Sequence, residues 1–103
     1  MLYLYPTDGH PDGPQNDAWF VLVANMIIPF GAHPLGTQGM PWYKKVDHLI
    51  YPEFGHPEVP PPHDMPHFAI SEYYCVPHDG HPNGPSDTPW YRFADVTGAP
   101  ALP

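Results

Sequence analysis

Fixed positive charge is nearly absent from this sequence. Lys44, Lys45 and Arg92 are its only lysine and arginine residues, against 11 carboxylates, so the formal net charge is −8 near neutrality. Lysine and arginine supply most of the affinity of proteins for phosphate backbones. The charge balance therefore predicts that neither DNA nor RNA is a partner of this chain.

Cysteine and long apolar runs are scarce as well. Cys75 is the only cysteine, which excludes a disulfide within the chain. The most apolar stretch, residues 18–32, contains Asn25 and is interrupted by Pro29. It is too short for an ordinary membrane-spanning helix, so we expect no membrane span.

Patterns typical of catalysis are also missing. Ser71 and Ser86 lie in no nucleophile-elbow context, and the sequence holds no glycine-rich phosphate loop that carries a lysine. The carboxylates lie in loop segments, with no pair that the sequence marks as acid and base. We expect that the protein is not an enzyme.

Proline, glycine and aromatic residues are abundant instead. The chain has 18 prolines and nine glycines, a level that indicates disorder when no period accompanies it. It also has three tryptophans, seven tyrosines and five phenylalanines, far more apolar surface than a disordered chain carries. These numbers predict an ordered, loop-rich protein.

The prolines and histidines form a regular pattern. Intervals of 23, 23, 25 and 23 residues separate Pro6, Pro29, Pro52, Pro77 and Pro100. Four residues after each of the first four prolines stands a histidine that precedes a further proline: His10, His33, His56 and His81. An aromatic pair follows each of them: Trp19-Phe20, Trp42-Tyr43, His67-Phe68 and Trp90-Tyr91. We interpret residues 1–103 as one domain of four repeats, residues 2–24, 25–47, 48–72 and 73–95, with residues 96–103 a partial fifth.

Each repeat predicts strand and loop but no helix. The segment before each proline is apolar or aromatic and suits a strand that ends at the proline. The connector that follows is rich in glycine, proline, asparagine and aspartate, which excludes helix almost entirely. About ten residues lie between each aromatic pair and the next proline. They would form one long bent strand or two short strands broken near Asp47 and Glu72, and the lack of glycine or proline there favours the bent strand.

The ends of the chain bear on how the repeats assemble. The sequence begins in the second half of a repeat and ends in the first half of another, so its first strand could pair beside its last. We therefore expect the all-β chain to close into a small barrel or propeller-like ring, which removes exposed strand edges. The alternative is an open ribbon of repeats.

The repeated histidines suggest two interpretations. If His10, His33, His56 and His81 point towards a common axis, four imidazoles converge, and imidazole suits metals such as zinc and copper. The alternative is a turn device, in which each histidine binds backbone with a ring nitrogen and holds no metal. The sequence favours the turn.

The aromatic residues also allow two interpretations. Trp19, Trp42, Trp90, Tyr43 and Tyr91 could form shallow platforms for sugar rings, repeated as in multivalent lectins. Aromatic residues at fixed positions of a small repeat more often form its core, because each buries a large area. The sequence favours the core.

The segment Cys75-Val76-Pro77-His78 is similar to the copper loop of plastocyanin-like cupredoxins, in which a cysteine is followed by proline and histidine. Asn83 stands where that family has its axial methionine, and no matching Asn-His segment lies upstream. The repeat aligns Cys75 with Leu4 and Ile50. We therefore interpret Cys75 as a buried strand residue rather than a copper ligand.

Taken together, the sequence predicts a structural or interaction protein, a rigid subunit that forms a homo-oligomer or joins a larger assembly. The alternatives are a histidine-based metal-binding module and a carbohydrate-binding protein. The histidines add a pH dependence. When protonated, all eight would cancel the net charge, so we expect the surface to be nearly uncharged near about pH 5.

Overall fold

The computed structural model describes the whole chain except residues 15, 32, 35–38, 57–63 and 83–84. Its described residues form eight strands and no helix, which confirms the expected all-β class. The strands are β1 (Leu2–Pro6), β2 (Phe20–Val23), β3 (Met26–Pro29), β4 (Tyr43–Val46), β5 (Leu49–Pro52), β6 (Phe68–Ser71), β7 (Tyr74–Pro77) and β8 (Tyr91–Ala94). None of the described segments is a helix with the length and apolarity that crossing a membrane requires.

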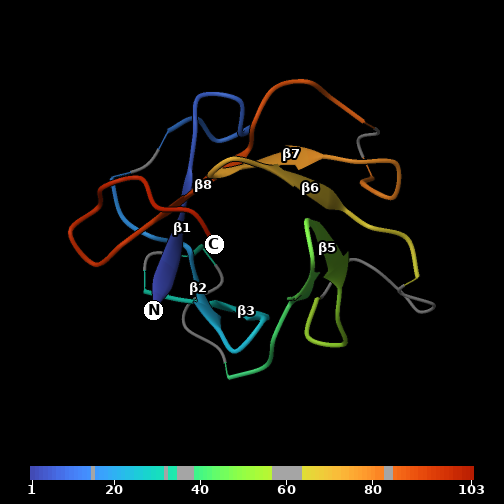
Figure 1. Ribbon diagram of the computed structural model, residues 1–103, viewed down its shortest axis with the longest axis horizontal. Helices are drawn as coiled ribbons and strands as arrows, with labels where there is room; N and C mark the ends of the chain where they lie inside the picture. The colour runs from blue at the N-terminus through green and yellow to red at the C-terminus, as the bar shows by residue number, and fades with distance from the viewer. Residues whose placement is uncertain (15, 32, 35–38, 57–63, 83–84) are drawn as a thin grey trace.

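The strands close into an antiparallel barrel. Each pairs with the strands before and after it in the chain, and β1 pairs with β8 (Figure 1). At this closure Leu4 lies opposite Phe93 and Pro6 opposite Tyr91. The expected ring is therefore confirmed and the open ribbon is not formed. Every described strand has a neighbour on both sides, so none presents a free hydrogen-bonding edge.

The expectation of one bent strand between aromatic pair and proline is wrong. Each of these stretches is a hairpin of two short strands, β2 with β3, β4 with β5, and β6 with β7. Two residues form each turn, at positions 24–25, 47–48 and 72–73. Ala24, Asn25, Asp47 and Glu72 there have φ angles of 48°, 70°, 55° and 57°. Non-glycine residues thus adopt the left-handed conformation that glycine usually supplies in tight hairpins, so neither glycine nor proline marks these turns in the sequence.

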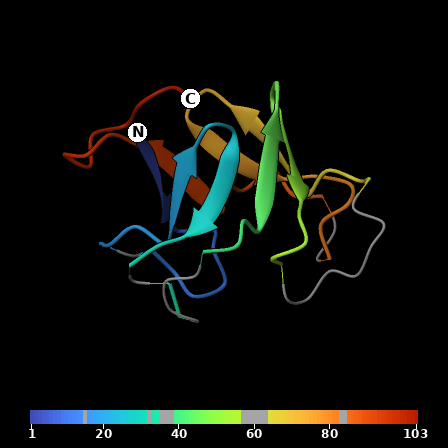
Figure 2. The same cartoon turned by 90° about the horizontal axis from the view of Figure 1, so that it is seen from below.

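The barrel has two different ends. The two-residue turns lie at one end together with both chain termini, and the described parts of the four long connections lie at the other (Figure 2). These connections run over residues 7–19, 30–42, 53–67 and 78–90. All four repeated histidines belong to them, so the fold gathers the histidines at a single end of the barrel.

Equivalent residues of the four repeats fill the barrel interior. In every hairpin, and at the β1–β8 closure, the proline of one strand lies opposite an aromatic residue of the other. The narrow space on the barrel axis is too small for water and is lined by Leu4, Ile27, Ile50, Cys75, Phe20, Tyr43, Phe68 and Tyr91. The barrel is thus a packed core and not a channel, and any ligand site must lie at an end or on the outside.

Candidate functional site

Backbone hydrogen bonds fix the long connections at the barrel end. The N–H of each histidine donates to the carbonyl three residues earlier, which closes a tight turn: His10 to Thr7, His33 to Phe30, His56 to Glu53 and His81 to His78. The first residue of each aromatic pair donates to the carbonyl of an interior residue of the preceding strand, as Trp19 does to Leu4 and Trp42 to Ile27. The histidine and aromatic side chains are therefore held in fixed positions relative to the barrel.

The histidines and the first residues of the aromatic pairs alternate in a closed ring. Each histidine ring lies between two such neighbours, with centroid separations of 4.3 to 5.5 Å. The order around the ring is His10, Trp19, His33, Trp42, His56, His67, His81 and Trp90. All eight contacts are edge-to-face or tilted, arrangements that the aromatic quadrupole favours.

The second residues of the aromatic pairs form a smaller ring beneath. Phe20, Tyr43, Phe68 and Tyr91 contact one another at centroid separations of 5.5 to 5.8 Å. The two tyrosines alternate with the two phenylalanines, and each tyrosine hydroxyl binds a histidine of the upper ring. The Oη–Nε2 distance is 3.1 Å for both Tyr91 with His10 and Tyr43 with His56.

The ring surrounds a cavity of about 380 Å³ at the end of the barrel. Among the residues that line it are all four predicted histidines and all five predicted aromatic residues: His10, His33, His56, His81, Trp19, Trp42, Trp90, Tyr43 and Tyr91. The histidines predicted for a metal site and the aromatic residues predicted for sugar sites therefore share one cavity. The predicted aromatic residues form a single pocket rather than several shallow platforms, and most of them are also part of the core.

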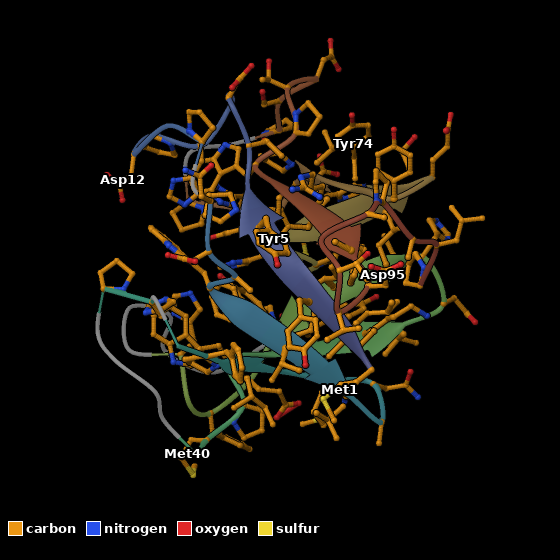
Figure 3. All side chains as sticks on the ribbon, turned by 90° about the vertical axis from the view of Figure 1, so that its left-hand side faces the viewer. Met1, Tyr5, Asp12, Met40, Tyr74 and Asp95 are labelled. Carbon is orange, nitrogen blue, oxygen red and sulfur yellow. The ribbon has the colours of Figure 1, made fainter. Side chains whose placement is uncertain are left out.

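Three further residues line the cavity: His67, Asp12 and Pro82. His67 replaces tryptophan in the third aromatic pair and is only 2% exposed. The repeat alignment could have identified it, since it occupies the position of Trp19, Trp42 and Trp90. Asp12 lies at the tip of its connection, at the end of the barrel opposite Met1 and Asp95 (Figure 3). It is the only formally charged residue among the described residues that line the cavity.

Burial lowers the pKa of three of the cavity histidines, His10, His33 and His81. Desolvation lowers the pKa of His10 and His33 below the ordinary 6.5, with Asp12 partly opposing the shift at His10. Desolvation, with smaller contributions from His56 and His10, lowers the pKa of His81 to about 4. The expectation that all eight histidines are protonated near about pH 5 must therefore be reduced. These three histidines stay neutral to a lower pH, so the chain keeps more of its negative charge there.

The arrangement of His10 bears on the metal interpretation. Its Nδ1 accepts a hydrogen bond from the Asp12 backbone N–H at 3.1 Å, so the ring proton lies on Nε2 and points to Tyr91. In the part of the chain that the structure describes, no three His, Cys, Asp or Glu side chains are grouped so that they could hold a metal ion. We therefore do not assign zinc or copper to this cavity.

The cupredoxin-like segment lies elsewhere. Cys75 is fully buried inside the barrel, where desolvation raises its pKa far above the usual thiol value. His78 lies at the start of the connection after β7, next to Asp79 on an outer groove. Asn83, which stands where that family has its axial methionine, lies outside the described residues.

Comparisons with protein-family models, with curated proteins and with solved structures found no match for this chain. The function must therefore be inferred from the geometry of the barrel and its cavity.

Proposed function

We propose that this protein binds an uncharged carbohydrate, as a single sugar or the end of a sugar chain, in the cavity at the loop end of the barrel. The observation that carries the proposal is the convergence of three tryptophans with neutral histidines around one cavity of about 380 Å³. Mouths of β-barrels are frequent ligand sites, and such sites combine apolar aromatic walls with a few oriented polar groups.

The chemistry of the walls selects the class of ligand. Indole and phenyl faces pack against the C–H faces of a sugar ring, while imidazole nitrogens, indole N–H groups and tyrosine hydroxyls can hydrogen-bond its hydroxyl groups. Among the described lining residues there is no lysine or arginine, and the chain carries a charge of −8, so an anionic ligand is disfavoured. A neutral polyol fits these conditions best.

The test uses the natural variation between repeats. Trp90 is the most exposed of the three tryptophans, and the equivalent position in the third repeat is His67. Trp90→His should therefore fold, and it should weaken sugar binding by about tenfold because one aromatic face is lost. Binding of monosaccharides and disaccharides is measured by tryptophan fluorescence and calorimetry. Tyr51→Ala, on β5 and outside the cavity lining, is the matched control.

The proposal fails if no neutral sugar binds, or if Trp90→His binds as tightly as the natural chain. Tetramethylammonium serves as a competing probe, because tryptophan faces also bind quaternary ammonium ions. If that ion binds and no sugar does, the cavity is a site for a cationic ligand and not for a carbohydrate.

We propose assembly with further copies or with a partner protein as the second candidate function. Met40 and Met65 are 57% and 53% exposed, at equivalent positions two residues before Trp42 and His67. Exposed methionines of this kind are typical of contact surfaces. Since the closed barrel offers no free strand edge among its described strands, association would have to use such side chains.

Sedimentation velocity across a range of protein concentrations tests the assembly. The double variant Met40→Gln/Met65→Gln should shift the chain towards the monomer, whereas Val96→Gln should not, because exposed Val96 directly follows Asp95, which lies at the opposite end of the barrel (Figure 3). A monomer at every concentration would contradict self-association.

A further inference from the structure

Two grooves on the outer wall of the barrel are built from equivalent residues. The first, the β1 groove, has a volume of about 460 Å³, and its lining includes Tyr3, Tyr5, Asp17 and Phe30. The second, the β8 groove, has a volume of about 450 Å³, and its lining includes Thr7, Asp8, Asn16, Tyr74, Thr88 and Arg92. Neither groove shares a residue with the cavity at the loop end.

The repeat explains why the grooves resemble each other. Tyr3 and Tyr74 both stand three residues before the proline that ends their strand, on the outward face of β1 and β7. Asp17 and Thr88 both stand two residues before a tryptophan, and Phe30 and Thr7 both directly follow a strand-ending proline. Each groove thus combines one tyrosine with residues from the two loop segments beside the next strand pair, β2–β3 for the first groove and β8–β1 for the second.

The two grooves adjoin each other. The Arg92 guanidinium carbon lies 4.7 Å from the centre of the Tyr5 ring, a cation–π contact. Arg92 lines the β8 groove and Tyr5 lines the β1 groove, so this pair forms the wall between them. Figure 3 shows Tyr5 on the outside of β1 and Tyr74 further round the barrel.

Each groove pairs aromatic faces with exposed hydrogen-bond acceptors. In the β1 groove the rings of Tyr3 and Phe30 lie 5.3 Å apart and Phe30 is 40% exposed, with the Asp17 carboxylate beside them. In the β8 groove Tyr74 lies with Asp8 and Asn16. Aromatic faces with carboxylate and amide acceptors suit sugar rings, whose hydroxyl groups donate to those acceptors.

We infer that the two grooves together bind one extended, neutral oligosaccharide along the side of the barrel. Among the described residues of both grooves Arg92 is the only cation, and it already stacks on Tyr5, so uronic acids and sulfated sugars lack a partner. An extended peptide cannot bind by adding a strand, because the described strands leave no free edge. This inference goes beyond the proposed function, since it uses other residues and a longer ligand.

Adjacent sites make binding depend on ligand length. A chain that occupies both grooves gains affinity over one that reaches a single groove, as linked binding events do. We expect neutral hexasaccharides to bind at least about tenfold more tightly than the corresponding disaccharides. The probes are β-glucan, xylan, mannan and chitin fragments of both lengths, and the measurement is isothermal titration calorimetry.

Substitutions distinguish the grooves from the cavity. Tyr3→Ala and Tyr74→Ala should each weaken hexasaccharide binding by about threefold to tenfold, from the loss of one aromatic face. Tyr51→Ala, on the outside of β5, is the matched control and should bind normally. Trp90→His should leave the length dependence unchanged. Circular dichroism confirms that each variant is folded.

Four results would overturn the inference. The first is the absence of hexasaccharide binding, and the second is hexasaccharide binding that Tyr3→Ala and Tyr74→Ala leave intact. The third is binding of a proline-rich peptide by a chain that binds no sugar, which would assign the grooves to polyproline ligands. The fourth is loss of sugar binding in Trp90→His alone, which would support the cavity and count against the grooves.

Discussion

His10 and Tyr91 join a connection at the barrel end to the interior of the barrel. The His10 Nε2–H donates to the Tyr91 hydroxyl at 3.1 Å, while Nδ1 of the same ring accepts the Asp12 backbone N–H. The imidazole is therefore neutral and both of its nitrogens are used. Tyr43 and His56 repeat the contact across the lower ring, where Phe20 and Phe68 occupy the other two equivalent positions.

The first prediction concerns this hydrogen bond. Either Tyr91→Phe or His10→Phe should lower the free energy of unfolding by about 1–3 kcal/mol, because each leaves a buried polar partner unsatisfied. The double variant should cost less than the sum of the two, since it removes both partners. Urea denaturation of the four proteins measures the cycle. Strictly additive losses would show that the two groups do not stabilise each other.

The second prediction concerns pH. Because burial lowers the pKa of His10, His33 and His81, the unfolded chain takes up protons first as the pH falls below 6.5. The free energy of unfolding should be highest above that pH and decrease as the pH falls towards about 4, the pKa of His81. Each pKa unit of depression corresponds to about 1.4 kcal/mol.

His81→Phe isolates this effect from the titration of carboxylates. The variant should lose less stability than the natural chain between about pH 7 and pH 4, while His48→Phe, at an exposed turn, should behave as the natural chain. Guanidinium denaturation at several pH values provides the comparison. Parallel curves for His81→Phe and the natural chain would contradict the prediction.

The third prediction concerns the close approach of two loop segments. The Gly80 N–H donates to the Pro66 carbonyl at 2.9 Å, and a Cβ atom at Gly80 would lie 2.6 Å from that oxygen. Gly80→Ala should therefore lower the free energy of unfolding by about 1–3 kcal/mol, as overpacking does. Gly39→Ala is the matched control, because a Cβ there meets nothing within 4 Å. Equal stability of the two variants would show that the segments can separate without cost.

The fourth prediction concerns Cys75, whose thiol is fully buried and whose pKa burial raises. It should not react with a thiol reagent such as Ellman's reagent in the native protein, and should react fully in concentrated guanidinium chloride. Cys75→Val, which matches the aliphatic residues at equivalent positions, should change stability by less than about 1.5 kcal/mol. Cys75→Ser should cost more, because it buries a hydroxyl. Rapid labelling of the native protein would contradict the buried position.

The strands and the absence of helix could be predicted because they depend on short-range effects. Pro29 and its equivalents cannot donate to a β-ladder, and glycine, asparagine and proline in the connections restrict φ and ψ locally. The turns were harder to predict. Ala24 and Glu72 adopt positive φ although neither residue favours it, since the pairing of the strands on either side holds them there.

The spacing of prolines and histidines was enough to align the repeats, and with them to predict the class of fold and the candidate histidines and tryptophans. That these side chains share one cavity, and that Tyr3 and Tyr74 lie in adjoining grooves on the outer wall, is visible only in the folded barrel. Both arrangements depend on the closure of the barrel. Pairing between β1 and β8 joins residues almost a whole chain apart, and that register sets which rings meet.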